Sequence, residues 1–240
     1  MRTVVGIHSC LETLMVRPRA IKKVILKNSA KDSNEYKDII ANCEKNRLRV
    51  DYASEGVLDK IARTHQGVAI DVNDEPKLNW ESLGQTKGEI IVAVDGIEDP
   101  HNLGAMIRTA WLFGAKGMFV TKHRTAGLTP AVNKVASGGV EHLPVEFHAN
   151  LAPLLKELKE KGFWVYGLSE KAKQPLYRTQ FSEKVVWVVG SEESGIRKPY
   201  LDLCDELITI PQVHARHSFN ASVALSIAVS ETYRQMQQIQ

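Results

Sequence analysis

The polar residues with the clearest chemical potential follow three apolar strands of the C-terminal half. The first polar segment is 95–108 (DGIEDPHNLGAMIR), in which Asn102 stands just before a predicted helix and could cap it or face a ligand. Arg108 lies in the nearly apolar helical stretch 105–113, where a guanidinium is costly to bury unless it is paired and hydrogen-bonded. Arg108 is therefore a candidate catalytic residue, with a helix-edge arginine that reaches water as the alternative.

The second polar segment is 190–195 (GSEESG), which also follows an apolar strand. Its two glycines permit a tight turn and a close approach of the backbone to a ligand. Their spacing matches neither a Walker loop nor the GxGxxG pattern of dinucleotide sites. Glu192 is a candidate carboxylate partner for Arg108, whereas an ordinary strand-to-helix turn explains the glycines equally well.

The third polar segment is 210–222, which leads into the last predicted helix. Ser218 and Asn220 stand near the start of that helix, where free backbone N–H groups favour an electron-rich ligand. A helix cap would account for one of these two side chains but not for both. His214 and His217 are three residues apart, yet no acidic or cysteine cluster nearby completes a ligand set, so no metal is expected.

Buried strands are predicted to place these segments at one edge of a parallel sheet. Apolar runs typical of strands covered on both faces occur at 90–94, 117–120, 163–166, 185–189 and 207–210. Helices are predicted between or after these strands at 103–113, 151–161 and 222–237. Ligands usually bind beyond the carboxyl ends of such strands, which is where the three polar segments are expected to lie.

The first 72 residues are predicted to form a separate small α/β unit with a mixed or parallel sheet. Its predicted strands are 23–26, 49–53 and 67–72, and its predicted helices are 10–16 with Ser9 as cap, 34–45 and 55–63. The following stretch contains Pro76 and Gly84 and lacks periodicity, which is typical of a linker. The predicted division is therefore a domain at 1–72, a linker at 73–88 and a domain at 89–240.

Charge is distributed unevenly along the chain, although the net charge is only +3. Residues 1–31 contain seven Lys or Arg and one acid, whereas residues 89–240 contain 16 basic and 16 acidic residues. A basic end favours a polyanionic partner, because neutralised phosphates release counterions; a solvated basic surface is the alternative. The candidate RNA-binding residues are Arg17, Arg19, Lys22 and Lys23.

Composition excludes several other classes of protein. Hydrophobic residues make up 43% and charged residues 25% of the chain, as is ordinary for a globular protein. No apolar run approaches the ~20 residues that span a bilayer, and the first residues lack the apolar core of a signal peptide. These features predict a cytoplasmic protein. The three widely spaced cysteines form no CxxC pair and predict neither a disulfide framework nor a zinc site.

Taken together, the three polar segments resemble the signature motifs of the SpoU/TrmH family, RNA ribose 2'-O-methyltransferases of the SPOUT class. The matching stretches are NLGAMIRTA at 102–110, GSEESGI at 190–196, and IP at 210–211 followed by SFNASVA at 218–224. The N-terminal part is similar, at 5–8 and 65–68, to the small RNA-binding domain of bacterial enzymes that methylate a guanosine of 23S ribosomal RNA. That domain is itself similar to ribosomal protein L30e, so the resemblance covers nearly the whole chain.

The resemblance implies an α/β fold with a trefoil knot in its C-terminal part, the cofactor S-adenosylmethionine, a ribosomal RNA substrate and a homodimer. It places the cofactor against the backbone near Gly190, Ile210 and Phe219. It gives Arg108 the task of helping the 2'-hydroxyl lose its proton, and electrostatic stabilisation of the alkoxide is favoured because arginine is hard to deprotonate. The remaining motif residues are expected to orient Arg108 or line the pocket: Asn102, Glu192, Ser218 and Asn220.

One position departs from the pattern of the family. His214 occupies a place, about three residues after the Ile-Pro pair, where close relatives carry a glycine. A side chain there could disturb the approach of the backbone to the cofactor. This departure leaves open a non-catalytic RNA-binding relative of the same fold. A methyltransferase of transfer RNA is a separate alternative, which keeps the activity and changes the substrate. Arg216 and His217 are candidates for additional RNA contacts.

Overall fold

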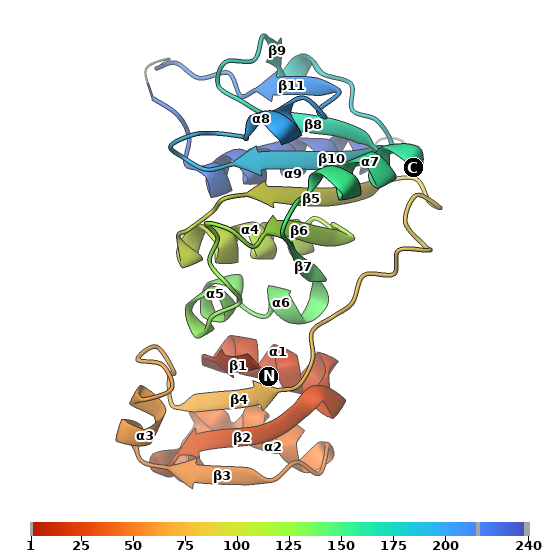
Figure 1. Ribbon diagram of the computed structural model, residues 1–240. Coiled ribbons are helices and arrows are strands. Elements are labelled where there is room, and N and C mark those ends of the chain that lie inside the picture. The colour runs from red at the N-terminus through yellow and green to blue at the C-terminus, as the bar shows by residue number, and fades with distance from the viewer. Residues whose placement is uncertain (1, 215–216, 238–240) are drawn as a thin grey trace.

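Two sheets, one above the other, organise the chain (Figure 1). The computed structural model describes residues 2–214 and 217–237. The first sheet lies within residues 2–72, and the second lies within residues 89–209. Between them, residues 73–88 contain neither a helix nor a strand and run along one side of the molecule (Figure 1).

The N-terminal sheet is mixed and has the strand order β1-β4-β2-β3. Strands β2 and β3 are parallel, while β4 is antiparallel to both β1 and β2. The strands are β1 (Arg2–Val5), β2 (Ile21–Lys27), β3 (Val50–Ala53) and β4 (Val68–Val72). The helices are α1 (Ile7–Val16), α2 (Lys37–Lys45) and α3 (Glu55–Asp59), with 3-10 turns at Pro18–Ala20, Asn28–Asp32 and Asn34–Tyr36.

Three expected boundaries in this unit were wrong. Helix α1 begins at Ile7 and is preceded by Gly6, whose φ of 90° allows the sharp turn out of β1. Ser9 therefore lies inside the helix rather than at its cap, and its hydroxyl donates to the carbonyl oxygen of Asn133 at 2.9 Å. The helix expected over 34–45 starts as a 3-10 turn, and the one expected over 55–63 ends at Asp59.

The C-terminal sheet is parallel, as the apolar runs predict, and the structure gives it seven strands in the order β7-β6-β5-β10-β8-β11-β9. The strands are β5 (Glu89–Asp95), β6 (Gly117–Thr121), β7 (Val145–His148), β8 (Trp164–Leu168), β9 (Gln174–Pro175), β10 (Lys184–Gly190) and β11 (Glu206–Thr209). The helices are α4 (Pro100–Leu112), α5 (Pro130–Ala136), α6 (Gly139–His142), α7 (Ala152–Glu160), α8 (Lys198–Leu201) and α9 (Ala221–Gln237), with a 3-10 turn at Leu176–Arg178.

Helices cover both faces of this sheet. Successive residues of each central strand point to opposite faces, and because these residues are apolar, both faces have to be covered. Ile90 and Val92 of β5 pack in one cluster with side chains of α4, α5 and α9. Ile91 and Ala93 pack in a second cluster with α7 and α8. Leu83 of the connecting segment also packs in the second cluster, so that segment is fixed to the sheet.

The short elements were not expected from the sequence. They include β1, β7, β9, α5, α6 and α8, none longer than seven residues. Helix α4 also starts earlier than expected, because Asp99 caps it and accepts a hydrogen bond from the backbone N–H of His101 at 2.9 Å. Asn102 therefore lies in the first turn of α4, and its side chain is available for contacts outside the helix.

Candidate active site

Residues from all three polar segments meet through the side chain of Asn102. Its Nδ2 donates to Oε1 of Glu192 at 2.5 Å. Its Oδ1 accepts from Nδ2 of Asn220 at 3.0 Å and from Oγ of Ser222 at 3.3 Å. The structure thus brings together residues that are 90 and 118 positions apart in sequence. With both its amide atoms engaged, Asn102 is held in one orientation at the carboxyl edge of the sheet.

Asn220 also caps the last helix. Its Oδ1 accepts from the backbone N–H groups of Ser222 at 2.9 Å and of Val223 at 3.4 Å, which are among the free donors at the start of α9. Ser218 has a different place, since it lines a neighbouring pocket. Asn220 therefore holds the start of the last helix, whereas Ser218 forms part of the pocket wall.

A pocket of about 730 Å³ opens beyond the carboxyl ends of β8, β10 and β11. Its size falls within the range of small-molecule sites. Gly190, Ile210 and Phe219, the three candidate cofactor residues, all line it. The rest of the wall comes from 168–172, 189–196, 208–212 and the start of α9. Much of this wall comes from loop segments, whose peptide N–H and C=O groups are not all engaged in a sheet or helix.

Gly190 shapes the pocket through a very close approach of backbone to backbone. A Cβ atom placed on Gly190 would lie 2.0 Å from the carbonyl carbon of Gly195 and 2.2 Å from the nitrogen of Ile196. The loop folds back on itself, and Ser191 forms an isolated bridge with Gly195, whose φ is +65°. Only glycine at position 190 leaves room for this loop geometry.

An ion pair between a buried carboxylate and a half-exposed arginine, not foreseen from the sequence, holds the far end of the same loop. Asp95 ends β5 with a side chain that is 1% exposed, and it accepts from Nε of Arg197 at 2.8 Å and from the backbone N–H of Arg197 at 3.0 Å. This contact with the carboxylate raises the pKa of Arg197. The signal available in the sequence was a carboxylate directly after the apolar run 90–94, because a carboxylate buried there requires a partner.

Arg108 is exposed to solvent on α4, as the helix-edge alternative predicts. Its Nη1 donates to Oγ of Ser137 at 3.2 Å, and Ser137 has a left-handed backbone conformation with φ of 49°. The expected pairing with Glu192 was wrong: among the described residues, no ion pair within 4.0 Å joins the two, and Glu192 contacts Asn102 instead. Sequence reasoning could not identify Ser137, because no charge or motif marks it.

His214 does not obstruct the pocket. It is exposed and does not line the pocket wall, which passes from Gln212 to Ser218. The amide of Gln212 donates to the backbone carbonyls of His214 and His217 and closes this loop. Within the described ranges, no group of three or more His, Cys, Asp or Glu could hold a metal ion. Arg216 lies outside the described residues.

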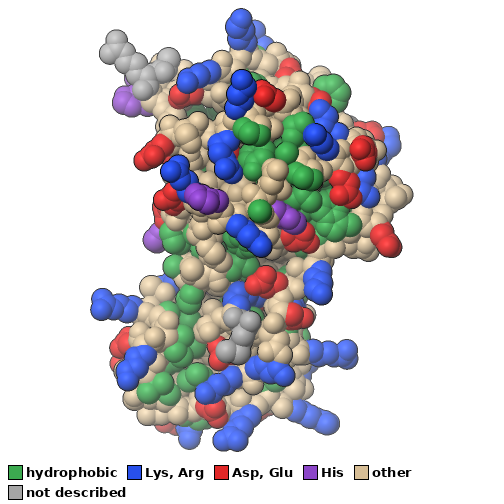
Figure 2. Space-filling model, in the orientation of Figure 1, with side chains coloured by type: hydrophobic (Ala, Val, Ile, Leu, Met, Phe, Trp, Pro, Cys, Tyr) green, Lys and Arg blue, Asp and Glu red, His purple; other side chains and the backbone are tan. Residues whose placement is uncertain are grey.

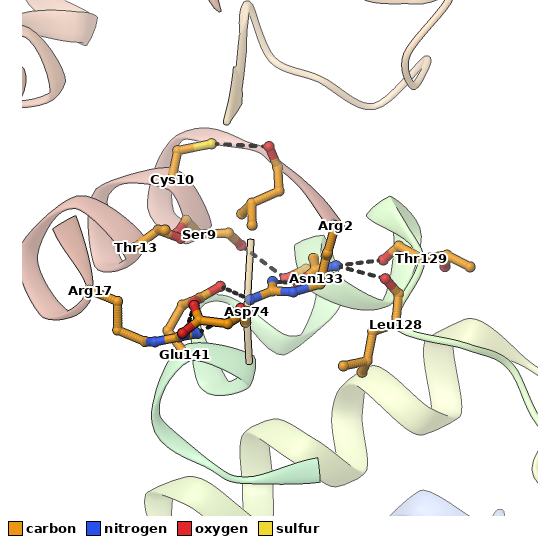
Figure 3. A network of polar contacts seen from close by, with 11 residues as sticks. Arg2, Ser9, Cys10, Thr13, Arg17, Asp74, Leu128, Thr129, Asn133 and Glu141 are labelled. Carbon is orange, nitrogen blue, oxygen red and sulfur yellow. Dashed lines mark hydrogen bonds and ion pairs between the residues drawn. The ribbon is translucent and has the colours of Figure 1, made fainter. Parts of the chain in front are cut away.

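The four candidate RNA-binding cations have different surroundings. Arg19 and Lys22 are exposed, and Lys23 is exposed beside Asp51 at 3.7 Å. Figure 2 shows Lys and Arg side chains projecting around the N-terminal unit. Arg17 is instead largely covered and pairs with Asp74 at 2.5 Å (Figure 3).

Two further features are the apolar character of the helices and the burial of the three cysteines. In the part of the chain that the structure describes, no helix has both the length and the apolar character needed to cross a bilayer. Cys10 and Cys43 are buried and Cys204 is half-buried, all as free thiols, and burial raises the pKa of Cys204 to about 12. The cysteines thus lie in the protein as small apolar side chains.

Comparison with known protein families finds two matches that divide the chain between them. Residues 89–230 match the SpoU rRNA Methylase family. Residues 3–77 match a family described as RNA 2'-O ribose methyltransferase substrate binding. The two matches confirm the resemblance that the three motifs indicate.

Individual proteins similar to this chain extend over its whole length. The 23S rRNA (guanosine-2'-O-)-methyltransferase RlmB of Nitrosomonas europaea is 35% identical, over 97% of this chain and 91% of the relative. The protein of the same name from Pseudomonas putida is 33% identical, over 99% of this chain and 98% of the relative. Among solved structures, the SpoU methyltransferase AviRb of Streptomyces viridochromogenes in complex with AdoMet has a TM-score of 0.83. It is 18% identical and covers 99% of this chain and 90% of its own, which shows a common fold.

Proposed function

The chain belongs to the SpoU rRNA methylase family, and we propose that it transfers a methyl group from S-adenosylmethionine to a ribose 2'-hydroxyl of ribosomal RNA. The proposed target is a guanosine of 23S ribosomal RNA, which the names of the two relatives describe. The observation that carries the proposal is the pocket at the carboxyl edge of the sheet, directly beside the network around Asn102. A ribosomal RNA substrate would place the protein in the cytoplasm.

The residues of the pocket fit S-adenosylmethionine, which has an adenosine part and a charged amino-acid part. Apolar side chains such as Ile210 and Phe219 can contact the adenine ring, and exposed peptide groups can hydrogen-bond its edge. Glu192 and Glu193 supply negative charge on the same wall for a cationic ligand. The loop around Gly190 lets backbone groups reach the ligand without an intervening side chain.

The chain's own residues have to position and activate the ribose. Bound S-adenosylmethionine would supply the electrophilic methyl group. A ribose 2'-hydroxyl is a weak acid, so Arg108 is proposed to stabilise the negative charge that develops as its proton leaves. Asn102, fixed by Glu192 and Asn220, is proposed to orient the ribose at the rim of the pocket. Holding the hydroxyl in line with the methyl group would supply much of the rate gain.

Assembly as a homodimer is proposed through the outer surface of α4 and α9. These helices lie side by side, joined by a hydrogen bond of 3.0 Å between the hydroxyls of Thr109 and Ser226. Leu112 of α4 is 62% exposed and Val223 of α9 is 45% exposed, so both helices present apolar side chains to solvent. A second copy that covered this surface would remove apolar area from water close to Arg108.

Two structural features support the remaining expectations. The chain leaves β11 beyond β8, and α9 then returns to pack on α4 and β10, as a C-terminal trefoil knot would require. The N-terminal unit at 1–72 is proposed to bind the RNA substrate, and 73–88 to connect it to the methyltransferase domain at 89–240. The family match at 3–77 and the exposed cations Arg19, Lys22 and Lys23 support this division.

The proposal is tested by titrating the purified protein with S-adenosylmethionine in a calorimeter and by assaying methyl transfer to unmodified 23S ribosomal RNA. We expect one site per chain with micromolar affinity, and a ribose methyl group on a guanosine. Methylation of transfer RNA instead would replace the substrate. Absence of cofactor binding by the folded protein, with and without RNA, would favour the non-catalytic relative and contradict the proposal.

Arg108→Ala separates binding from chemistry. The variant should retain its affinity for S-adenosylmethionine, because Arg108 does not line the pocket, and should lose methyl transfer. Arg178→Ala, which removes an exposed arginine after β9, is the matched control and should transfer methyl groups normally. Unchanged turnover in Arg108→Ala would rule out the proposed role of this side chain.

A further inference from the structure

A long stretch of the methyltransferase domain carries only positive charge. Residues 100–140 contain five Lys or Arg and not a single Asp or Glu. This stretch forms α4, β6, α5 and the loop between β6 and α5. Two of its cations, Lys122 and Arg124, follow β6 at the carboxyl edge of the sheet, whereas Lys116 precedes β6 at the opposite edge. Polyanionic ligands are attracted to such a stretch.

The loop after β6 is held firmly against the loop after β5. The backbone N–H of Gly96 donates to Oγ1 of Thr121 at 3.1 Å, and the N–H of Ala126 donates to the carbonyl oxygen of Ile97 at 2.9 Å. Arg124 has a left-handed backbone conformation with φ of 55°, which is costly for a residue with a side chain. Fixed at both ends, the loop presents its cations in a defined place, and the side chains remain exposed.

This loop borders the pocket. A Cβ atom placed on Gly96 would lie 3.9 Å from the carbonyl oxygen of Arg124 and 4.0 Å from Cβ of Ser191. Ser191 lines the pocket wall. The backbone of the loop at Arg124 is therefore separated from the pocket wall by no more than the turn at Gly96.

Helix α5 follows this loop in the chain and reaches the N-terminal unit. It packs against β1 and α1, and Cγ of Lys134 lies 3.6 Å from the position of a Cβ on Gly6 (Figure 1). The Oε1 of Gln66 lies 3.1 Å from that same position. Lys27 lies close to the residue after Gln66, because its Cδ lies 2.8 Å from the position of a Cβ on Gly67. Lys134, Gln66 and Lys27 thus form a continuous series across the contact between the two units.

Buried polar contacts fix the two units in this relative position. Arg2 of β1 is 8% exposed, and its guanidinium reaches Oδ1 of Asn133 at 2.6 Å and Oε1 of Glu141 at 2.7 Å (Figure 3). Arg17 adds a second ion pair to Glu141 at 3.2 Å. His142 and Glu12 lie 2.9 Å apart in the same contact. The acidic side chains at this contact, Glu12 and Glu141, therefore already have basic partners, which weakens their repulsion of an incoming anion.

We propose that Lys122, Arg124 and Lys134 form a phosphate-binding track along which the RNA backbone passes from the N-terminal unit to the pocket. The inference rests on the proposed function, since it takes RNA as the substrate. Phosphate contacts of this kind position a nucleic acid without reading its sequence. The track explains how one chain can hold RNA with the N-terminal unit and still deliver a ribose to a pocket in the other domain.

The test measures RNA affinity as a function of salt. Each phosphate contact contributes about one to the slope of log K against log salt concentration. The double variant Lys122→Gln/Arg124→Gln keeps long polar side chains and removes two charges, so its slope with unmodified 23S ribosomal RNA should fall by about two. Lys134→Gln should lower the slope by about one. Lys116→Gln, at the other end of β6, is the matched control and should leave the slope unchanged.

Affinity for S-adenosylmethionine, measured in parallel, reports that each variant is folded. An unchanged salt slope in the double variant, with RNA binding by the unmodified protein intact, would overturn the track and leave the proposed function standing. A slope that falls equally in Lys116→Gln would also overturn it, because the effect would then be one of total charge. Failure of the unmodified protein to bind RNA would refute the proposed function itself, and the track with it.

Discussion

Replacing Gly190 by alanine is the smallest change that should disable the pocket. The added Cβ would lie 2.0 Å from the carbonyl carbon of Gly195, whereas ordinary contacts begin at about 3.4 Å. Because the opposing atoms are backbone, the loop at 191–195 has to move by more than 1 Å. Overpacking of this kind typically costs about 1–3 kcal/mol. The exposed loop can relieve the strain by shifting, so the cost should appear in the pocket rather than in global stability.

Every 1.4 kcal/mol lost from binding weakens affinity about tenfold. We therefore expect the affinity of Gly190→Ala for S-adenosylmethionine to fall by about 10- to 100-fold in a calorimetric titration, while the thermal midpoint changes little. Gly127→Ala is the matched control in the same domain, since a Cβ on Gly127 meets nothing within 4 Å. Unchanged affinity in Gly190→Ala would refute the argument that this loop forms the wall of the cofactor site.

Three further predictions concern buried polar groups. Arg197→Ala removes the side-chain partner of the buried Asp95 carboxylate, which keeps its hydrogen bond from the backbone N–H of residue 197, and should lower the free energy of unfolding by about 1–3 kcal/mol, measured by urea denaturation; no change would contradict the pairing. Burial raises the pKa of Glu89, but hydrogen bonds from Thr86 and Gly84 outweigh this effect and lower it overall. Glu89 thus stabilises the fold above its unfolded pKa of about 4.3, and the stability difference from Glu89→Gln should shrink as pH falls below about 4; a pH-independent difference would contradict this. Cys204, with its pKa raised to about 12 by burial, should resist a thiol reagent at pH 8 until the protein unfolds, as followed by thiol absorbance; rapid modification of the native protein would contradict its burial.

The central sheet was predictable because its strands are nearly continuous apolar runs, and runs of that kind are stable only when both faces are covered. The three polar motifs that follow these strands, at 102–110, 190–196 and 210–224, could also be recognised from the sequence. The contacts of Asn102 were not, because Glu192 and Asn220 approach it through loop closures of 90 and 118 residues that no local pattern encodes. The sequence suggested a carboxylate for Arg108, and the structure gave it the hydroxyl of Ser137 instead.

Short elements escaped prediction for a related reason. Helix α5 has seven residues and α6 has four, so neither spans enough turns to show a helical period. Their formation depends on tertiary contacts, such as the approach of Gly104 on α4 to Val135, where a Cβ would lie 2.7 Å from the valine side chain. These same short helices make the contact with the N-terminal unit, so the relative placement of the two units was beyond sequence reasoning.

The position of α5 connects the two halves of the proposed function. One end of the loop before it is fixed next to the pocket, and Asn133 within it accepts a hydrogen bond from Arg2 of the N-terminal unit. Glu141 is buried in this contact and forms ion pairs with Arg2 and Arg17, so separating the two units would break both pairs. RNA held by the N-terminal unit would therefore meet a pocket at a fixed distance. If the proposed function holds, that rigidity would favour substrates whose target ribose lies at a matching distance from the bound segment, which is selection by RNA shape without direct reading of bases.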